Sequence, residues 1–325
     1  MDLSKYFNDN FPVAAPLVGF PAVHLNKSTI KENLYNSSIQ TDSLIRINDH
    51  FNPDILFTFM DLAVEAYALG APVINNDMES STVKEYIIDN SSDLENIKNT
   101  FLSDNDRVKV FTETVKNLKE KYPEKPVAAY VSGPFTLAGL LMGANNIALN
   151  TVLKKDFVIK SLELTTEVIK QYSNALINAG ADMIVVLEPS AVMLSPEMFR
   201  EFSGIWVKDL TQSLNTELIL HICGNTEHLI EPMCETGAAG LSLDAAVDLP
   251  AISSRIPEKT YIIGNIDPVG VMCEKSPKEI KQDTMALKTA MKDYSNFIVS
   301  TGCDLPPETP AENITAFMEA GKTIY

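Results

Sequence analysis

Three residues with the chemistry of soft metal ligands, His221, Cys223 and Cys303, lie at the ends of two apolar runs. The run Glu217–His221 is typical of a buried strand, and side chains two residues apart on a strand point to the same face. His221 and Cys223 therefore face the same way, and Cys303 follows a second run, Phe297–Ser300. One imidazole and two thiolates suit zinc, and three protein ligands leave a fourth position open, as in catalytic zinc sites.

The alternative interpretation is that these cysteines only pack in the core, because free cysteines often behave as small buried hydrophobic residues. The Gly-Asn pair after Cys223 and the Gly-Cys-Asp sequence around Cys303 favour a metal site. Cys234 falls in a predicted helix and is interpreted as a packing residue, whereas Cys273 stays an alternative to Cys303. The long spacing of the four cysteines argues against disulfides and predicts reduced thiols.

A zinc ion held by two thiolates has little Lewis acidity and suits the capture of a thiol, which it keeps as a nucleophilic thiolate at neutral pH. Histidine-rich sites, in contrast, activate water. The ligand set therefore favours alkyl transfer that involves sulfur, although ligand type alone leaves water activation open.

Three carboxylates are predicted to support this chemistry. Glu188 follows a run expected beside that of His221, so it is predicted to be a fourth, displaceable ligand or otherwise to anchor a loop. Asp244 and Asp267 are predicted to orient the substrate or to hold His221 in one tautomer.

The elements that must position these residues are eight short apolar runs that alternate with helical patterns. Several runs are rich in Val and Ile with little alternation, as expected of strands covered on both faces. Alternating strand and helix implies a parallel sheet, and eight strands favour an α/β (β/α)8 TIM barrel, whose chemistry collects at the carboxyl ends of the strands. The predicted strands are Val13–Phe20, Asp54–Met60, Val127–Val131, Met183–Leu187, Glu217–His221, Gly240–Leu243, Tyr261–Gly264 and Phe297–Ser300.

The organisation predicted for the whole chain is a single barrel domain, residues 1–325, with an N-terminal extension and a helical insertion at residues 77–122 after the second strand. A long amphipathic helix is predicted over Lys154–Ala179, ended by Gly180. Acids or candidate ligands follow six of the eight predicted strands. A single acid at a strand end often only caps the next helix, but six such positions favour a functional site. These residues are Asp61, Glu188, His221, Asp244, Asp267 and Cys303.

The composition limits the classes of partner. The net charge of −17 and the pI of about 4.6 disfavour binding to nucleic acid or to anionic membranes. No apolar stretch reaches the length of a membrane span, and the N-terminus lacks the pattern of a signal peptide, so a cytoplasmic location is expected.

Several motifs lie along most of the chain, namely His221–Thr226, Gly264–Pro268, Thr301–Cys303, Asp61–Ala66 and Gly133–Phe135, with Pro310 and Glu312–Ile314. Together they resemble the uroporphyrinogen decarboxylase superfamily and, within it, the zinc-dependent branch typified by methylcobamide:coenzyme M methyltransferases. The resemblance implies a (β/α)8 barrel, a zinc at His221, Cys223 and Cys303, and a methyl group passed between the cobalt of a corrinoid and a zinc-bound acceptor or donor. The corrinoid is expected on a partner protein, because the chain lacks the Asp-x-His-x-x-Gly motif.

Three alternatives to a thiol-methylating enzyme stay open. The enzyme could work in reverse and take methyl from a methoxy compound to Co(I), or the chain could be a non-catalytic corrinoid- or metal-binding subunit of a larger complex. Decarboxylation of a porphyrin-like acid is disfavoured, because only four arginines are present to bind an octa-anion. The same scarcity leaves Arg200 as the one candidate partner for the sulfonate of coenzyme M.

Overall fold

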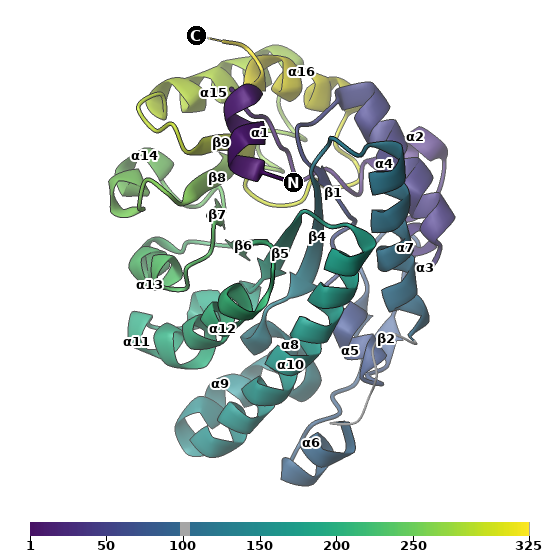
Figure 1. The fold of residues 1–325 in the computed structure, drawn as a ribbon, viewed down its shortest axis with the longest axis vertical. Helices are drawn as coiled ribbons and strands as arrows, with labels where there is room; N and C mark the ends of the chain where they lie inside the picture. The colour runs from purple at the N-terminus through teal and green to yellow at the C-terminus, as the bar shows by residue number, and fades with distance from the viewer. Residues whose placement is uncertain (98–104, 325) are drawn as a thin grey trace.

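The computed structural model describes residues 1–97 and 105–324. Its centre is a curled, parallel, seven-stranded sheet wrapped by helices on its outer side (Figure 1). The α/β fold with a parallel sheet is therefore confirmed, and the strands run in the order β1-β4-β5-β6-β7-β8-β9. Their bounds are β1 Leu56–Phe57, β4 Val127–Ser132, β5 Met183–Leu187, β6 Glu217–Ile222, β7 Gly240–Leu243, β8 Tyr261–Ile266 and β9 Phe297–Thr301.

The first predicted strand, Val13–Phe20, does not join this ladder, which has seven strands instead of eight. Only Ala14 forms a bridge, to Val299 of β9, and its carbonyl accepts a hydrogen bond from Asp54 N at 3.0 Å. Pro16 lacks a backbone N–H and cannot donate to a ladder. The segment thus occupies the place between β9 and β1 that an eighth strand would take.

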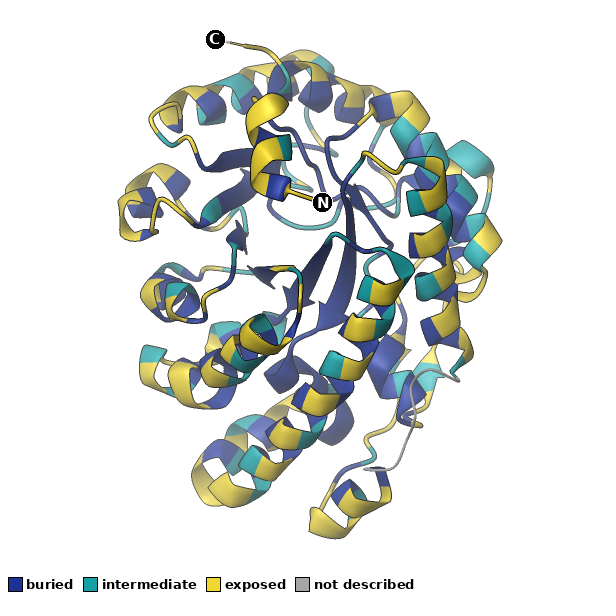
Figure 2. Ribbon diagram, viewed as in Figure 1, coloured by how far each residue is buried: buried dark blue, intermediate teal, exposed yellow. Residues whose placement is uncertain are grey.

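Side chains of the strands alternate between the interior of the curled sheet and the helical layer. Nearly all residues of the seven-stranded sheet are buried (Figure 2). On β5, Met183 and Val185 belong to the interior cluster, whereas Ile184 packs with the helices. Helix α1 (Leu3–Asp9) adds Leu3 and Phe7 to the interior cluster. Each large apolar side chain buried in this way stabilises the fold by roughly 1.5–3 kcal/mol.

The helical layer follows the sequence closely. The predicted helix at Lys154–Ala179 is confirmed as α10 (Lys155–Ala179), and Gly180 ends it in the left-handed conformation (φ +111°). Within the described ranges, no single helix is long and apolar enough to cross a membrane, although α8 and α9, bent by 107°, pass that test together. The other helices of seven or more residues are α4 Ser37–Phe51, α6 Ser91–Ile97, α7 Asp106–Lys121, α8 Pro134–Met142, α9 Ala144–Leu153, α12 Ile205–Ser213, α15 Pro277–Ala290 and α16 Ala311–Gly321.

Shorter helices fill the connections between these elements. A π-helical turn, η3 (Arg200–Gly204), joins α11 (Pro196–Phe199) to α12, so that the three form one continuous helix with a bulge. The short α-helices are α2 Ala22–Asn26, α3 Ile30–Tyr35, α5 Val64–Ala68, α11 Pro196–Phe199, α13 Ile230–Glu235 and α14 Leu249–Ile252. The 3-10 and π turns are η2 Pro189–Met193, η3 Arg200–Gly204, η4 Glu227–Leu229 and η5 Ser253–Arg255.

The segment predicted as a helical insertion, residues 77–122, is only partly helical. It contains α6 and α7, and residues 98–104 of it lie outside the described residues. It also contains β3 (Thr82–Val83), which pairs antiparallel with β2 (Val73–Ile74). Because α7 packs against α4 and β4, this helix belongs to the layer around the sheet.

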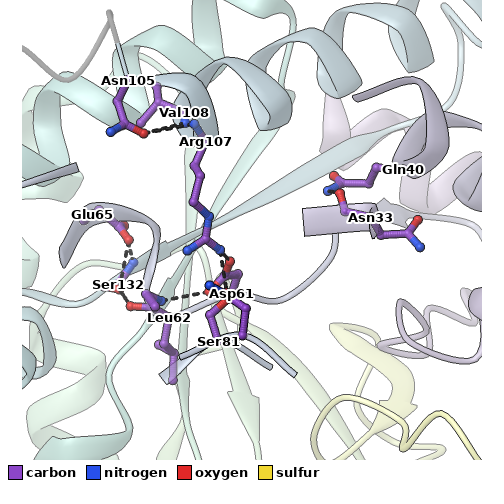
Figure 3. Close-up of polar contacts among 12 residues, drawn as sticks. Asn33, Gln40, Asp61, Leu62, Glu65, Ser81, Asn105, Arg107, Val108 and Ser132 are labelled. Carbon is purple, nitrogen blue, oxygen red and sulfur yellow. Dashed lines mark hydrogen bonds and ion pairs between the residues drawn. The ribbon is translucent and has the colours of Figure 1, made fainter. Parts of the chain in front are cut away.

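A buried ion pair ties the loop after β1 to the start of α7 (Figure 3). The guanidinium of Arg107 donates to Asp61, and also to Ser81 Oγ at 3.1 Å. The rings of Tyr35 and Tyr67 lie 4.6 and 5.4 Å from the guanidinium carbon and add cation–π attraction. Both side chains of the pair are almost fully buried, so each charge depends on the other for its solvation.

A second buried carboxyl, Glu65 of α5, holds the end of β4 (Figure 3). It accepts hydrogen bonds from Ser132 N at 2.6 Å and from Ser132 Oγ at 3.1 Å. Burial raises the pKa of Glu65 to about 7, although the bonds from Ser132 lower it. A protonated Glu65 can donate a hydrogen bond to Ser132 Oγ. The Ser132 hydroxyl in turn donates to the carbonyl of Leu62 at 3.1 Å.

Because the pKa of Glu65 is raised, the stability of the protein should depend on pH, and the Glu65→Gln substitution should remove this dependence. The contribution of Glu65 is fully present below its unfolded pKa of 4.5 and is lost as pH rises through about 7. The loss amounts to about 3 kcal/mol between these limits. Glutamine keeps both hydrogen bonds to Ser132 without a charge, so the variant should be more stable than the natural protein at pH 8 but not at pH 4.5. Urea unfolding at both pH values checks this, and equal pH dependence in the two proteins would contradict it.

Candidate metal centre

His221, Cys223 and Cys303 bring their ligand atoms together at the carboxyl ends of β6 and β9. His221 Nε2 lies 3.0 Å from Cys223 Sγ and 3.8 Å from Cys303 Sγ, and the two sulfurs are 3.4 Å apart. Within residues 1–97 and 105–324, this is the only group of three or more His, Cys, Asp or Glu residues whose ligand atoms lie within 4.8 Å of one another. The structure thus unites the three predicted ligands.

The sheet fixes the direction of His221. Its neighbour Ile219 lies in the interior cluster, so by alternation His221 also faces inward. The register of β6 and β7 pairs His221 with Ser242, and Nδ1 of the imidazole lies 2.9 Å from Ser242 Oγ. Because Nδ1 is engaged there, Nε2 is the nitrogen presented to the two sulfurs, as a metal ligand requires.

The spacing of the three donor atoms fits zinc. Zinc bonds of about 2.3 Å to sulfur and about 2.0 Å to nitrogen, in tetrahedral geometry, hold such atoms about 3.5–3.8 Å apart. The separations of 3.0, 3.4 and 3.8 Å need adjustments of about half an ångström at most. Two sulfurs and one imidazole also match the ligand types that zinc prefers.

The two thiols form one coupled pair. A hydrogen bond from Cys303 lowers the pKa of Cys223, and the same bond, with burial, raises the pKa of Cys303. Without a metal, Cys223 is therefore the more acidic of the two thiols, and Cys303 holds its proton more strongly. Metal binding displaces this proton, so metal affinity should rise with pH.

Glu188 does not join this group. Its carboxylate accepts hydrogen bonds from Phe135 N at 2.9 Å and Thr136 N at 2.8 Å, at the start of α8, and from Ser203 Oγ at 2.9 Å. The N-terminus of a helix favours a negative charge, whereas burial raises the pKa of Glu188. The direction follows from strand alternation, because Leu187 faces the interior and the next residue faces the helices.

Asp244 and Asp267 both lie at the predicted strand ends, but each carboxylate is used locally. Oδ1 of each accepts from the backbone N–H two residues further on, at 2.9 Å. Asn265 Nδ2 donates to the carbonyl of Asp244 at 2.9 Å and so holds that loop against β8. The partner of His221 Nδ1 is Ser242 rather than either aspartate, which corrects the prediction about the tautomer.

Two residues near the cluster, Tyr130 and Asp304, were not predicted as site residues. Tyr130 faces inward from β4, and burial raises its pKa well above the usual value, with Asp304, Cys303 and Cys223 raising it further. Burial and the Cys303 sulfur likewise raise the pKa of Asp304. Two features of the sequence could have indicated them: alternation along β4 points Tyr130 inward, and Asp304 is an acid directly after the candidate ligand Cys303.

The remaining candidates lie elsewhere. Cys273, the alternative to Cys303, has its thiol 3.3 Å from the carbonyl of Pro268 and 3.2 Å from Thr309 Oγ1. Arg200, the candidate for a sulfonate, forms a surface pair with Glu235. Neither residue is part of the cluster.

A sequence profile of known proteins, described as "Uroporphyrinogen decarboxylase (URO-D)", matches residues 22–324. This chain belongs to the uroporphyrinogen decarboxylase family. The match covers His221, Cys223 and Cys303 and all seven strands of the sheet, and it confirms the resemblance found in the motifs.

Relatives within the URO-D family carry two different activities in their names. Methylcobamide:CoM methyltransferase MtbA of Methanosarcina acetivorans is 29% identical over 269 residues, which cover 81% of this chain and 77% of the relative. MtaA of Methanosarcina barkeri is 29% identical over 223 residues, covering 67% and 65%. Uroporphyrinogen decarboxylase of Prochlorococcus marinus is 28% identical over 288 residues, covering 84% and 81%.

Solved structures show the same fold. A methyltransferase from Methanosarcina mazei superposes with a TM-score of 0.89 at 23% identity, covering 96% of this chain and 94% of that one. A B12-independent methionine synthase from Shewanella superposes with a TM-score of 0.58 at 13% identity, covering 87% of both chains. At these identities the likeness concerns the arrangement of the sheet and helices.

Proposed function

We propose that this protein is a zinc-dependent methyltransferase that moves a methyl group from the cobalt of a corrinoid partner protein to a small thiol. The observation that carries the proposal is the group of His221, Cys223 and Cys303, whose donor atoms lie 3.0–3.8 Å apart. The relatives named methylcobamide:CoM methyltransferases support it. The whole chain would serve as one (β/α)8 barrel domain.

In this proposal the three side chains hold zinc, which when bound lowers the pKa of a thiol so that a thiolate persists at neutral pH. Ser242 keeps Nε2 of His221 directed at the metal position. The thiolate sulfur forms the new S–CH3 bond, and the electron pair of the Co–CH3 bond stays on cobalt as Co(I). This transfer needs no separate oxidant or reductant, because the electron pair of the broken Co–CH3 bond stays on the cobalt of the partner protein.

The arginines favour methyl transfer over decarboxylation of a polycarboxylate. Each of the four is paired with a carboxylate of the chain itself: Arg46 with Asp42, Arg107 with Asp61, Arg200 with Glu235 and Arg255 with Glu231. None of these guanidiniums lies unpaired at the cluster to bind an anionic substrate. Among the described residues, the arginines therefore offer no free guanidinium for the polycarboxylate of a uroporphyrinogen decarboxylase, an activity named among the relatives.

The test is metal content followed by thiol titration. We expect one zinc per chain and about one proton released when homocysteine or coenzyme M is added near neutral pH. Methylcobalamin with each thiol should then yield the methyl thioether. Zinc without proton release, together with methyl transfer from methoxyarenes to Co(I), would instead support the reverse direction, and protein without zinc would refute the proposal.

A further inference from the structure

We propose that Glu188, although it is not a ligand, is a positioning residue for the metal centre. Its carboxylate anchors the turn η2, and η2 in turn holds the loop that carries Cys223. The inference rests on the metal site of the function proposed above and adds to it a residue that sets the geometry of that site.

The anchor is a buried carboxylate whose two oxygens are both occupied. Glu188 is 0% exposed. Its Oε1 accepts hydrogen bonds from Phe135 N and Ser203 Oγ, both at 2.9 Å, and its Oε2 accepts from Thr136 N at 2.8 Å. A Cβ on Gly133 would lie 2.1 Å from Oε2, so the carboxylate reaches α8 only past a glycine. Glu188 thus joins the end of β5 to the start of α8 and to the π-helical turn η3.

The backbone of Glu188 begins η2 and also contacts β6. Glu188 N donates to the carbonyl of His221 at 2.9 Å, and the carbonyl of Glu188 accepts from Ala191 N at 3.0 Å. Ser190 N donates to Thr136 Oγ1 at 3.2 Å, which is a second tie between η2 and α8. The place of η2 beside the metal-bearing strand is therefore set where Glu188 is anchored.

The turn η2 also contacts the loop after β6. A Cβ on Gly224 would lie 3.3 Å from Val192 Cγ2, so η2 packs closely on the residue that directly follows Cys223. Gly224 has a φ of +85°, which residues with a side chain rarely adopt. His228 Nε2 lies 3.1 Å from the carbonyl of Leu194, just beyond η2, and fixes the other end of the loop. Cys223 is thus held in place by β6 on one side and by η2 on the other.

An amide cannot replace this carboxylate without a displacement. Each oxygen of Glu188 accepts from one backbone N–H, so the NH2 group of a glutamine would face a backbone N–H in either orientation. A buried N–H without an acceptor is costly, and the start of α8 and η2 should move apart to relieve it. We expect zinc to bind to Glu188→Gln roughly tenfold or more weakly, as found for residues that orient metal ligands.

Zinc affinity and the absorption of bound Co(II) measure this effect. Competition with a chromophoric chelator gives the affinity, and the d–d and thiolate-to-cobalt bands of Co(II) report the geometry and the number of thiolate ligands. These bands should shift or weaken in Glu188→Gln. Asp54→Asn is the matched control, since Asp54 is also buried and accepts from Ala14 N at 2.8 Å, but at the amino end of β1. It should lower stability and leave both metal readouts unchanged.

Val192→Ala tests the contact between η2 and the metal loop, and it decides the matter if Glu188→Gln does not fold. Val192 is half-buried, and its truncation should weaken zinc binding by a smaller factor and shift the same bands. Because both substitutions act through η2, their combined effect on zinc affinity should be less than the product of the two. Natural zinc affinity and unchanged Co(II) bands in folded Glu188→Gln, or in Val192→Ala where the former does not fold, would overturn the inference and leave the metal site standing. A natural protein that binds neither zinc nor Co(II) would refute both.

Discussion

The Cys223→Ser variant is expected to lose both bound zinc and methyl transfer. Serine is a poor ligand for a metal that is held by soft thiolates, and the remaining pair, His221 and Cys303, offers only two of the three donors. Loss of a partner that merely orients a ligand weakens metal binding roughly 10–100-fold, so loss of the ligand itself should exceed that range. Zinc content after dialysis against a weak chelator and turnover with methylcobalamin measure the two effects.

Cys273→Ser is the matched control for this experiment. Its thiol lies against Pro268 and Thr309 rather than in the cluster, so the variant should keep its zinc and its activity. Full activity of Cys223→Ser in metal-free protein would refute the zinc-dependent mechanism. If Cys273→Ser lost its zinc and Cys223→Ser kept it, Cys273 rather than Cys223 would be the metal ligand.

Asp61→Ala is expected to lower the free energy of unfolding by about 3–5 kcal/mol. The variant leaves the guanidinium of Arg107 buried, since this side chain has 1% exposure and lies under the rings of Tyr35 and Tyr67. An uncompensated buried charge costs far more than the pair itself contributes. Urea unfolding at neutral pH, with the slope compared between variants, gives the change in stability.

Two further variants test the cause of this loss. Glu235→Gln breaks an exposed bidentate pair with Arg200 and should change stability little, because water screens both charges. Replacing both buried residues, as Asp61→Leu with Arg107→Met, should recover much of the stability lost in Asp61→Ala. A small effect of Asp61→Ala alone would show that water reaches the guanidinium.

Most of the sheet could be predicted from the sequence because its strands are buried on both faces. A strand of this kind is a continuous apolar run, and the runs at β4 to β9 end within two residues of the structure. The exceptions are short or irregular. The segment at Val13 contains Pro16 and forms a single bridge, and the two-residue strands β2 and β3 carry no recognisable pattern.

The direction of side chains at strand ends could be predicted less well. His221 and Cys223 share a face because they are two residues apart, and this holds whichever face is inward. Glu188 stands alone after its strand, so its direction depends on knowing that Leu187 faces inward; an error of one residue reverses the face. Ser242 was not predicted as a partner of His221, because only the register between β6 and β7 places the two residues opposite each other.

The position of the N-terminal segment has a consequence for synthesis on the ribosome. Leu17 N donates to Thr301 Oγ1 across 284 residues of sequence, and Gly19 N reaches Asp304 across 285. A chain still being made has His221 and Cys223 outside the ribosome long before Cys303, so it offers a metal only two of three ligands. Contacts of such long range form late and slowly. In the proposed zinc enzyme, tight capture of the metal would therefore require a chain that has been made at least as far as Cys303 and in which β9 has joined the sheet.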